Sequence, residues 1–550
     1  MALLASPPPV GTAFGLCVVG AGPVGLSLAL EAAARGLDVL LVEAGTQAVG
    51  GAGTHGRSTA EVLDKSHHAP LDRVTVSAVG GTSWLWGGRC VPFEDVDFEV
   101  RDHVPHSGWP ISAADLSPYS AGAARYLGCG TADFRSHEPE WSGLGDVSMA
   151  QQERWARHPR LDRSLGARAL AHPLIHMLCD ARVTDIDFDD DLTSVAGLRL
   201  RHPTGSVDVR AEAYVLACGG LETTRLLLAV QRRQPTLFGG TDGHLGRYYM
   251  GHLTGSIANV ELADPSKFRD LDFRRDSGGT FVRRRFTISP RAQRAHLLLN
   301  TSFYLGNPPV WDHRHGSATL SLFWLALNLP GLGRIFGRAA ARELHRGPTP
   351  RPWRQHVLNV LRRPGRAVVE ILQMAYLRFL AAVRRSVYVV HNADGAYALR
   401  YHAEQVPNAE SRVWLDERSA EDDLPQLVID FRYVSQDVAS VLAAHVLLDE
   451  QLRASGHGRL VYRYPEIERA AAVLAQAGDG YHQIGTTRMS GTPTGGVVDA
   501  DCRVHGLTNL FVTSSSVFST AGEANPTFMA VCLALRLADR LSRTSTRGEP

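Results

Sequence analysis

Two short apolar runs near the N-terminus define the first elements that the hydrophobic pattern predicts. Leu16 to Val19 are continuously apolar, as in a strand buried on both faces of a parallel sheet. A helix fits from Pro23, because the N–H that proline lacks has no partner in a first helical turn. A second apolar run, Leu37 to Val42, predicts the next strand. This order of strand, helix and strand indicates an α/β unit with a parallel sheet.

Three glycines lie at the turn between the first strand and the helix. Gly20 permits a tight turn, Gly22 lets the backbone approach a pyrophosphate, and Gly25 lets the helix pack closely on the strand. Glu43 follows about 20 residues later, where a carboxylate can bind both hydroxyls of a ribose. Glycine turns alone often serve packing, but strand, helix and acidic residue in register predict a dinucleotide site.

Further glycine-rich and apolar segments extend this pattern. The loop from Gly80 to Gly88 brackets Thr82, Ser83 and two tryptophans. Its backbone can lie flat against a planar ligand, or it forms a turn over an aromatic core. Ala213 to Gly220 predicts a buried strand that ends in Gly-Gly and is followed by a helix, and two runs between residues 181 and 201 predict a meander leading into it.

Composition is that of an ordinary globular chain. The 550 residues are 44% hydrophobic and 21% charged, and the net charge of +1 argues against a general nucleic-acid binder. Seven cysteines without paired spacing indicate neither a disulfide framework nor a metal site. The start of the chain lacks the features of a secretory signal, and the apolar stretch 317–333 is broken by Asn328 and Pro330, so we expect a cytoplasmic protein without a transmembrane helix.

The middle of the chain is less regular. Alternating runs such as Leu297 to Tyr304 and Gln426 to Tyr433 predict strands of an antiparallel sheet. Residues 334–385 hold 12 arginines, no lysine and two glutamates, and apolar residues at helical spacing predict helices over 353–361 and 368–383. One interpretation is a solvated face over an apolar underside, neutralised by acidic loops such as 417–423. The other is contact with an anionic membrane or a phosphorylated substrate.

The C-terminal block carries the candidate chemistry. His482 lies in a Tyr-His-Gln-Ile-Gly-Thr-Thr-Arg-Met run, and Asn525 precedes Pro526 at the start of a helix predicted through Leu537. Together with the segments above, these motifs resemble the glucose-methanol-choline (GMC) family of flavin oxidoreductases over nearly the whole chain, and within it pyranose oxidases and related sugar dehydrogenases. The resemblance implies an α/β fold: a Rossmann-like FAD-binding domain and a substrate domain built on an antiparallel sheet plus helices.

This resemblance also implies domain limits and cofactor contacts. The FAD-binding domain is expected to comprise 1–100, 165–250 and 478–550, and the substrate domain 101–164 and 251–477. Leu85 stands where pyranose oxidases carry a histidine bonded to the flavin, so FAD should be non-covalent. Ser514 replaces an aspartate of many members. The implied cofactor-binding residues are Gly20, Gly22, Pro23, Val24, Gly25, Glu43, Ala44, Gly81, Thr82, Ser83, Trp86, Gly87, Gly88, Val183, Ala217, Gly219, Ser514, Ser515, Asn525, Pro526 and Thr527.

His482 and Asn525 match the reaction-centre pair of that family. A neutral imidazole can take the proton of an alcohol while hydride leaves the same carbon for flavin N5, and an amide can stabilise the developing alkoxide. On residue type alone, His482 would be a structural histidine and Asn525 a helix N-cap, a role compatible with catalysis. His252 and His505 are interpreted as structural.

The sequence therefore predicts an FAD-dependent alcohol or sugar dehydrogenase or oxidase. The substrate is a sugar-like small molecule, with phosphorylated and lipid-linked forms left open, as are the electron acceptor and peripheral contact with a membrane through 334–385. Two alternatives also stay open: a flavin-containing lyase of the same fold, and a flavoprotein scaffold on a membrane complex.

Overall fold

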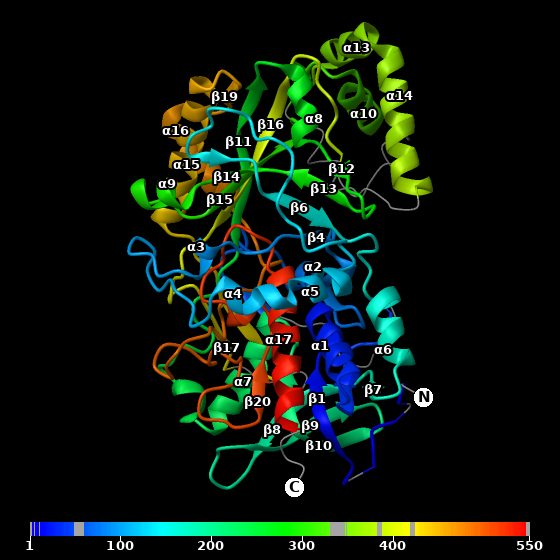
Figure 1. Cartoon of the computed structure of the whole chain (residues 1–550), viewed down its shortest axis with the longest axis vertical. Helices are drawn as coiled ribbons and strands as arrows, with labels where there is room; N and C mark the ends of the chain where they lie inside the picture. The colour runs from blue at the N-terminus through cyan, green and yellow to red at the C-terminus, as the bar shows by residue number, and fades with distance from the viewer. Residues whose placement is uncertain are drawn as a thin grey trace.

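Two hydrophobic cores divide the chain in the computed structural model, which describes residues 3–4, 6–9, 11–48, 60–329, 347, 349–381, 388–417 and 424–545. The first core surrounds the sheet in the lower half of Figure 1, and the second surrounds the sheet in the upper half. The N-terminal and C-terminal elements both belong to the lower domain.

A seven-stranded sheet organises the first domain. Its strands are β1 (Ala13–Val19), β2 (Val39–Val42), β7 (Ile175–Leu178), β8 (Arg182–Phe188), β9 (Val195–His202), β10 (Gly205–Leu216) and β20 (Leu510–Val512). The parallel part has the order β7-β2-β1-β10-β20, and the first half of β10 continues into antiparallel β9 and β8. The strands predicted at 16–19 and 37–42 and the meander before β10 are therefore confirmed.

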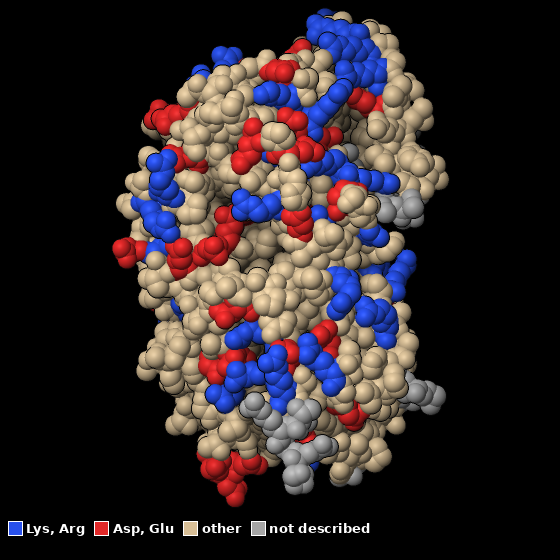
Figure 2. Space-filling view, in the orientation of Figure 1, with Lys and Arg blue, Asp and Glu red and all other residues tan. Residues whose placement is uncertain are grey.

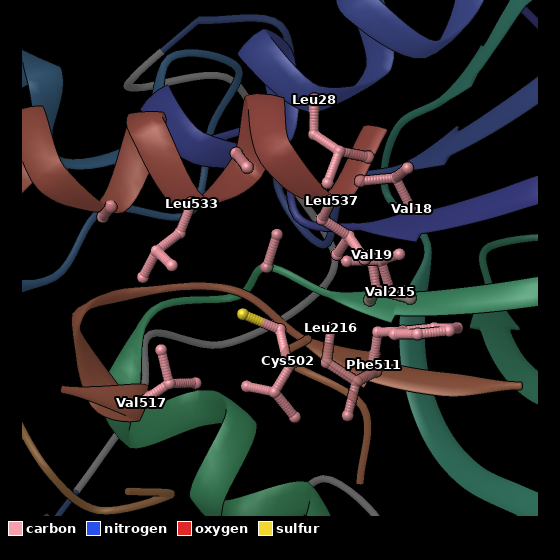
Figure 3. Packing of buried hydrophobic residues seen from close by; sticks show 14 of the residues in the cluster. Val18, Val19, Leu28, Val215, Leu216, Cys502, Phe511, Val517, Leu533 and Leu537 are labelled. Carbon is pink, nitrogen blue, oxygen red and sulfur yellow. The ribbon is translucent and has the colours of Figure 1, made fainter. Parts of the chain in front are cut away.

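The sheet is covered on both faces, which explains its unbroken apolar strands. Leu28 of helix α1 (Pro23–Ala34) and Leu537 of helix α17 (Thr527–Ser545) pack beside Val18, while Phe511 lies on the other side (Figure 3). The predicted helix start at Pro23 is confirmed. Other helices of this half are α2 (Leu71–Val74), α4 (Ala113–Leu116), α5 (Ser120–Leu127), α6 (Ala167–Ala171) and α7 (Gly220–Arg233), and α3 (Asp95–Phe98) lies between the halves.

An antiparallel six-stranded sheet organises the second domain. It has the order β19-β11-β16-β15-β14-β5, and α15 and α16 pack on it. Its elements are β5 (Val147–Ser148), β11 (His252–Leu262), β14 (Phe286–Ile288), β15 (Thr301–Gly306), β16 (Ala396–Glu404), β19 (Gly458–Tyr462), α8 (Phe268–Leu271), α9 (Pro290–Ala295), α15 (Ser435–Ala454) and α16 (Glu466–Gln476). A smaller sheet beside it joins β4 (Arg89–Cys90), β6 (Gln152–Trp155), β12 (Arg274–Arg275) and β13 (Phe281–Arg284).

Two stretches differ from the expected domain limits. Residues 111–134 were expected in the substrate domain, but Leu116 and Leu127 join the first core because α5 packs on α17. Residues on both sides of the acidic loop also join the first core, namely Val413, Leu415, Leu424, Leu427, Ile429 and Phe431. There β17 (Arg412–Leu415) and β18 (Leu427–Asp430) form a three-stranded sheet with β3 (Ala60–Val62), so the run at 426–433 supplies a strand of this sheet.

Three helices project from the end of the second domain that lies away from the first (Figure 1). They are α10 (Ala318–Asn328), α13 (Trp353–Arg362) and α14 (Pro364–Ala375), and α10 carries Trp324 of a small separate core. The predicted helix at 353–361 is confirmed, and the next begins at Pro364, four residues earlier than expected. Of the arginine-rich segment, 334–346, 348 and 382–385 lie outside the described residues, as do 418–423 of the acidic loop. Among the described helices, none combines the length and the apolar character needed to cross a bilayer.

Candidate active site

A long groove opens where the parallel strands of the first domain end. Val19, Glu43, Ala217 and Ser514 follow or end four of these strands, and all four line the groove. Because parallel strands bring their carboxyl ends to one edge of the sheet, segments far apart in the chain meet there. The groove encloses about 1370 Å³, including its open mouth.

The glycines of the first turn have separable roles in this geometry. Gly20 has a φ of +102°, which favours glycine. A Cβ on Gly25 would lie 1.9 Å from the carbonyl oxygen of Gly20, so only glycine lets α1 pack on β1. A Cβ on Gly22 would meet its nearest atom, Cα of Gly81, at 4.0 Å. Gly22 therefore has space around it and lines the groove, whereas Gly25 serves close packing.

The start of α1 is suited to an anion. Gly22 is its N-cap and provides no side chain to satisfy the first N–H groups, and Pro23 follows at the first helical position. The first turn carries no acidic residue. Unpaired N–H groups and the positive end of the helix dipole thus lie beside the groove, as a pyrophosphate requires.

Glu43 connects the turn to the end of β2. Its buried carboxylate accepts hydrogen bonds from the backbone N–H of Ala21, at 2.9 Å, and of Gly45, at 2.8 Å. Burial raises the pKa of Glu43, and the two N–H groups oppose that shift. The carboxylate also lines the groove. Its contact with a ribose stays a prediction.

Most of the other predicted cofactor positions line the groove, but some lie behind it. Ser83 is buried and accepts a hydrogen bond from the N–H of Leu161 at 3.2 Å, and the indole of Trp86 donates to the carbonyl of Pro159 at 2.6 Å. The lining positions are Gly20, Gly22, Pro23, Val24, Glu43, Ala44, Gly81, Thr82, Val183, Ala217, Gly219, Ser514, Ser515, Pro526 and Thr527; Gly25, Ser83, Trp86, Gly87, Gly88 and Asn525 are outside this set.

The groove also has walls that the motifs did not indicate. Residues 75–77 and Arg182 line it, and so does Gln483, whose side chain accepts a hydrogen bond from the N–H of Leu221 at 3.0 Å. Ser515 donates to the carbonyl of Gln483 at 2.8 Å. The neighbouring Ser514 hydroxyl accepts from the N–H of Ser516 at 3.1 Å, so it is engaged within its own loop. Only Gln483 had a sequence signal, its place beside His482.

At one end of the groove the structure brings His482 and Asn525 together. The amide Nδ2 of Asn525 lies 2.9 Å from Nε2 of His482, and the His482 side chain is 18% exposed. An amide nitrogen only donates, so Nε2 is the acceptor and the proton of the neutral ring lies on Nδ1. This leaves Nε2 as the basic nitrogen facing the groove end.

A buried carboxylate lies behind the His482 ring. Oδ2 of Asp479 is 2.9 Å from Nδ1 of His482. Its other oxygen accepts from the N–H groups of Tyr481 and His482 at 2.8 and 3.0 Å. Burial alone would raise the pKa of Asp479, but the adjacent His482 and His252 outweigh this and hold the pKa well below 3.8. The ionised carboxylate therefore fixes the imidazole and can balance a positive charge on it.

Two further histidines complete this cluster. His252 lies at the start of β11 with its Nδ1 3.0 Å from Nδ1 of His482, and the ring of His402, on the paired strand β16, is 4.3 Å from the ring of His252. His402 donates from Nδ1 to the carbonyl of Glu523 at 2.6 Å. Burial lowers the pKa of both His252 and His402, which keeps them neutral. His252 had been interpreted as structural, yet it contacts the candidate base directly.

Comparison with protein families supports the cofactor and the reaction type. Residues 16–313 match the model of the FAD dependent oxidoreductases. Residues 407–534 match the model of the GMC oxidoreductases, in the C-terminal region that holds His482 and Asn525. The two matches together span most of the groove and the end that holds His482 and Asn525.

Similar proteins are found among characterised enzymes and solved structures. The chain is 23% identical to 6'''-hydroxyparomomycin C oxidase of Streptomyces lividus and 23% identical to paromamine 6'-oxidase of Streptomyces fradiae. Each comparison covers 95% of this chain and 90% of the relative. An FAD-dependent oxidoreductase of Chaetomium thermophilum has the same fold, with a TM-score of 0.54 at 17% identity over 97% of this chain and 100% of the other.

Proposed function

Because this chain belongs to the FAD-dependent oxidoreductases of the GMC type, we propose that it oxidises a CH–OH group of a sugar-like alcohol with His482 as the base. One observation carries the proposal. Nε2 of His482 lies 2.9 Å from the amide nitrogen of Asn525 at the end of a groove whose other walls suit a dinucleotide. A substrate hydroxyl that takes the place of this contact can donate to Nε2 of His482 and accept from the Asn525 amide, so it meets a base and a donor together.

The position of the ring proton on His482 decides which nitrogen can accept the proton of the substrate. The substrate hydroxyl donates to Nε2 of His482, and Nδ1 keeps its proton and its bond to Asp479. His482 then carries a positive charge, which the carboxylate of Asp479 balances without accepting the proton. Asn525 donates its amide N–H to the substrate oxygen as negative charge develops there. Asp479 thus acts by positioning and charge balance.

The backbone around the groove supports FAD as its occupant. The open space at Gly22 and the N-terminus of α1 fit its pyrophosphate, and Ala217 and Gly219 would lie along the dinucleotide. When bound, FAD supplies N5 as the acceptor of the hydride that leaves the substrate carbon. Leu85 is exposed and offers no nucleophile, which supports non-covalent binding.

The substrate class rests on the similar enzymes. Two oxidases named for paromamine and a hydroxylated paromomycin share 23% identity with this chain over most of its length. This supports a sugar-like hydroxyl compound as substrate, and phosphorylated and lipid-linked forms stay predictions. The likeness to pyranose oxidases stays a prediction.

The proposal is tested by mixing the FAD-loaded protein anaerobically with a panel of alcohols and sugars, including paromamine, and following the loss of flavin absorbance. His482→Ala should slow reduction by ~10² to 10⁴-fold while FAD stays bound. His505→Ala is the matched control, because His505 contacts the carbonyl of Ser490 and does not line the groove.

Reduction by a member of the panel that His482→Ala does not slow would remove His482 as the base. A flavin that is reduced chemically but by no alcohol or sugar would favour the lyase or scaffold alternatives instead.

A further inference from the structure

Helix α13 buries its polar face and α14 leaves most of its apolar side chains exposed, which differs from the usual arrangement of amphipathic helices. The buried side of α13 carries His356 and Asn359. His356 Nδ1 is 3.0 Å from the hydroxyl of Ser321, and the Asn359 amide donates to the carbonyl of His313 at 2.8 Å. In α14, Glu370 accepts a hydrogen bond from Thr319, on α10. Polar side chains therefore face the domain along α13, and in α14 Glu370 does so beside the buried Ala367.

The apolar side chains of the same helices face outward. Within each helix they recur at four-residue spacing, which places them in one stripe. Single exposed apolar residues are normal, but a contiguous stripe marks an interaction surface. We call this the outer helical surface, and it includes two residues of the π-helical turn Tyr376–Leu380 that continues α14. It consists of Val357, Leu358, Leu361, Val368, Val369, Leu372, Tyr376 and Leu380, with exposed fractions between 42% and 77%.

Positive charge borders this surface. Arg354, Arg362 and Arg363 are exposed and have no ion-pair partner among the residues that the structure describes. Arg366 pairs with Glu370 at 2.9 Å, and Glu370 is the only acidic residue between Trp353 and Tyr376. Figure 2 shows basic side chains gathered at the end of the molecule where Figure 1 places α13, beside the largely uncharged surface along α14.

We propose that the outer helical surface binds the face of an anionic lipid bilayer. An apolar stripe flanked by unpaired arginines matches a bilayer surface, where acyl chains take the apolar side chains and anionic headgroups take the guanidinium groups. This charge complementarity favours a membrane over a second copy of the chain, because pairing two such surfaces would bring arginines together. The helices would lie in the plane of the interface, at the end of the molecule remote from the groove (Figure 1).

The test uses the full FAD-loaded chain and vesicles of phosphatidylcholine with or without phosphatidylserine. The protein should sediment with the mixed vesicles and be released as salt is raised. The double variant Leu361→Glu with Leu372→Glu should bind at least about tenfold more weakly. Ile467→Glu is the matched control, because Ile467 is 91% exposed on α16, outside this surface. Arg362→Gln with Arg363→Gln should weaken binding to the mixed vesicles alone.

Each result bears on the proposal. It is overturned if the wild-type chain does not bind the mixed vesicles, or if the leucine double variant binds them as tightly as wild type. Sedimentation velocity tests the alternative that a second copy of the chain covers this surface. A wild-type dimer that does not bind vesicles and that dissociates in the leucine double variant would assign the surface to that second copy. Flavin reduction is unaffected by these changes, so the outcome is independent of the reaction at His482.

Discussion

The groove wall and the reaction centre are built in opposite ways. At Gly20, Gly22 and Gly25 the absence of side chains makes the site, and what remains is backbone and a helix end. Around His482 the site consists of side chains, with one buried carboxylate and neutral histidines within hydrogen-bonding or ring contact. The first therefore depends on shape, and the second on charge and tautomer.

The largest effect is expected from a substitution in the glycine turn, where shape alone makes the site. We expect Gly25→Ala to abolish the folded, flavin-binding chain, because its Cβ would lie 1.9 Å from a backbone oxygen and cost more than about 3 kcal/mol. Gly491→Ala is the control, since nothing lies within 4 Å of a Cβ there. Soluble yield and bound flavin measure the effect. A Gly25→Ala protein with a full complement of FAD would show that the turn tolerates movement.

The reaction centre is tested by neutralising its carboxylate. Asp479→Asn should slow flavin reduction by substrate by ~10² to 10⁴-fold while FAD remains bound, because the amide cannot balance a charged His482. Asp479→Glu should recover part of the rate. Asp64→Asn changes an exposed aspartate that likewise accepts from a backbone N–H, and it should be neutral. Equal rates in Asp479→Asn and wild type would confine Asp479 to a structural role.

The substitution Gly22→Ala separates an effect on FAD binding from an effect on the packing of the fold. Gly22→Ala meets no atom closer than 4.0 Å, so the melting temperature of the apoprotein should stay the same. The added methyl group occupies space expected for the pyrophosphate, and we expect FAD to bind about tenfold more weakly, or ~1.4 kcal/mol. Titration of the apoprotein with FAD measures this. Unchanged affinity would mean that the phosphates lie elsewhere.

The smallest effect concerns acid sensitivity of the reaction centre. Burial holds the pKa of His402 well below 6.5, so the folded protein keeps this ring neutral while the unfolded chain protonates it. The contribution of the neutral His402 to the free energy of unfolding is fully present above pH 6.5. It falls as the pH decreases below 6.5, by ~1.4 kcal/mol per pH unit for one proton. Urea unfolding measures the loss of unfolding free energy between pH 6.5 and pH 5.5. This loss should be about 1 kcal/mol smaller in His402→Gln than in the wild-type protein. An identical decline would show that His402 does not bind a proton on unfolding.

The contrast between the two regions also explains what the sequence could predict. The glycine turn, Glu43 and the flanking strands are contiguous, so their pattern carries their geometry. His482 and Asn525 were found through motifs, and each lies on its own short segment. His252 and His402 join the centre only because β11 and β16 pair, a contact that no local pattern reports. Asp479 had a short-range signal, three residues before His482, but nothing in its spacing revealed the direction of its carboxylate.

Helices α13 and α14 show the same limit in another form. Their periodicity predicted helices, and one interpretation gave them an apolar underside. In α13 the structure reverses this, because His356 and Asn359 find partners on and near α10, and the apolar stripe of both helices is left exposed. Periodicity fixes the position of the two faces around a helix, but the neighbouring element decides which face is buried.

The packing of α17 against α1 has a consequence for how the protein is made. The glycine turn is synthesised early. The sheet of the first domain is complete only when β20 pairs with β10 and α17 packs on α1, and both elements are synthesised near the end of translation. The nascent chain must therefore carry an unfinished nucleotide fold through most of translation. A prematurely terminated product would expose the apolar faces of β1 and α1, which marks it for chaperones and proteases before it can capture a flavin.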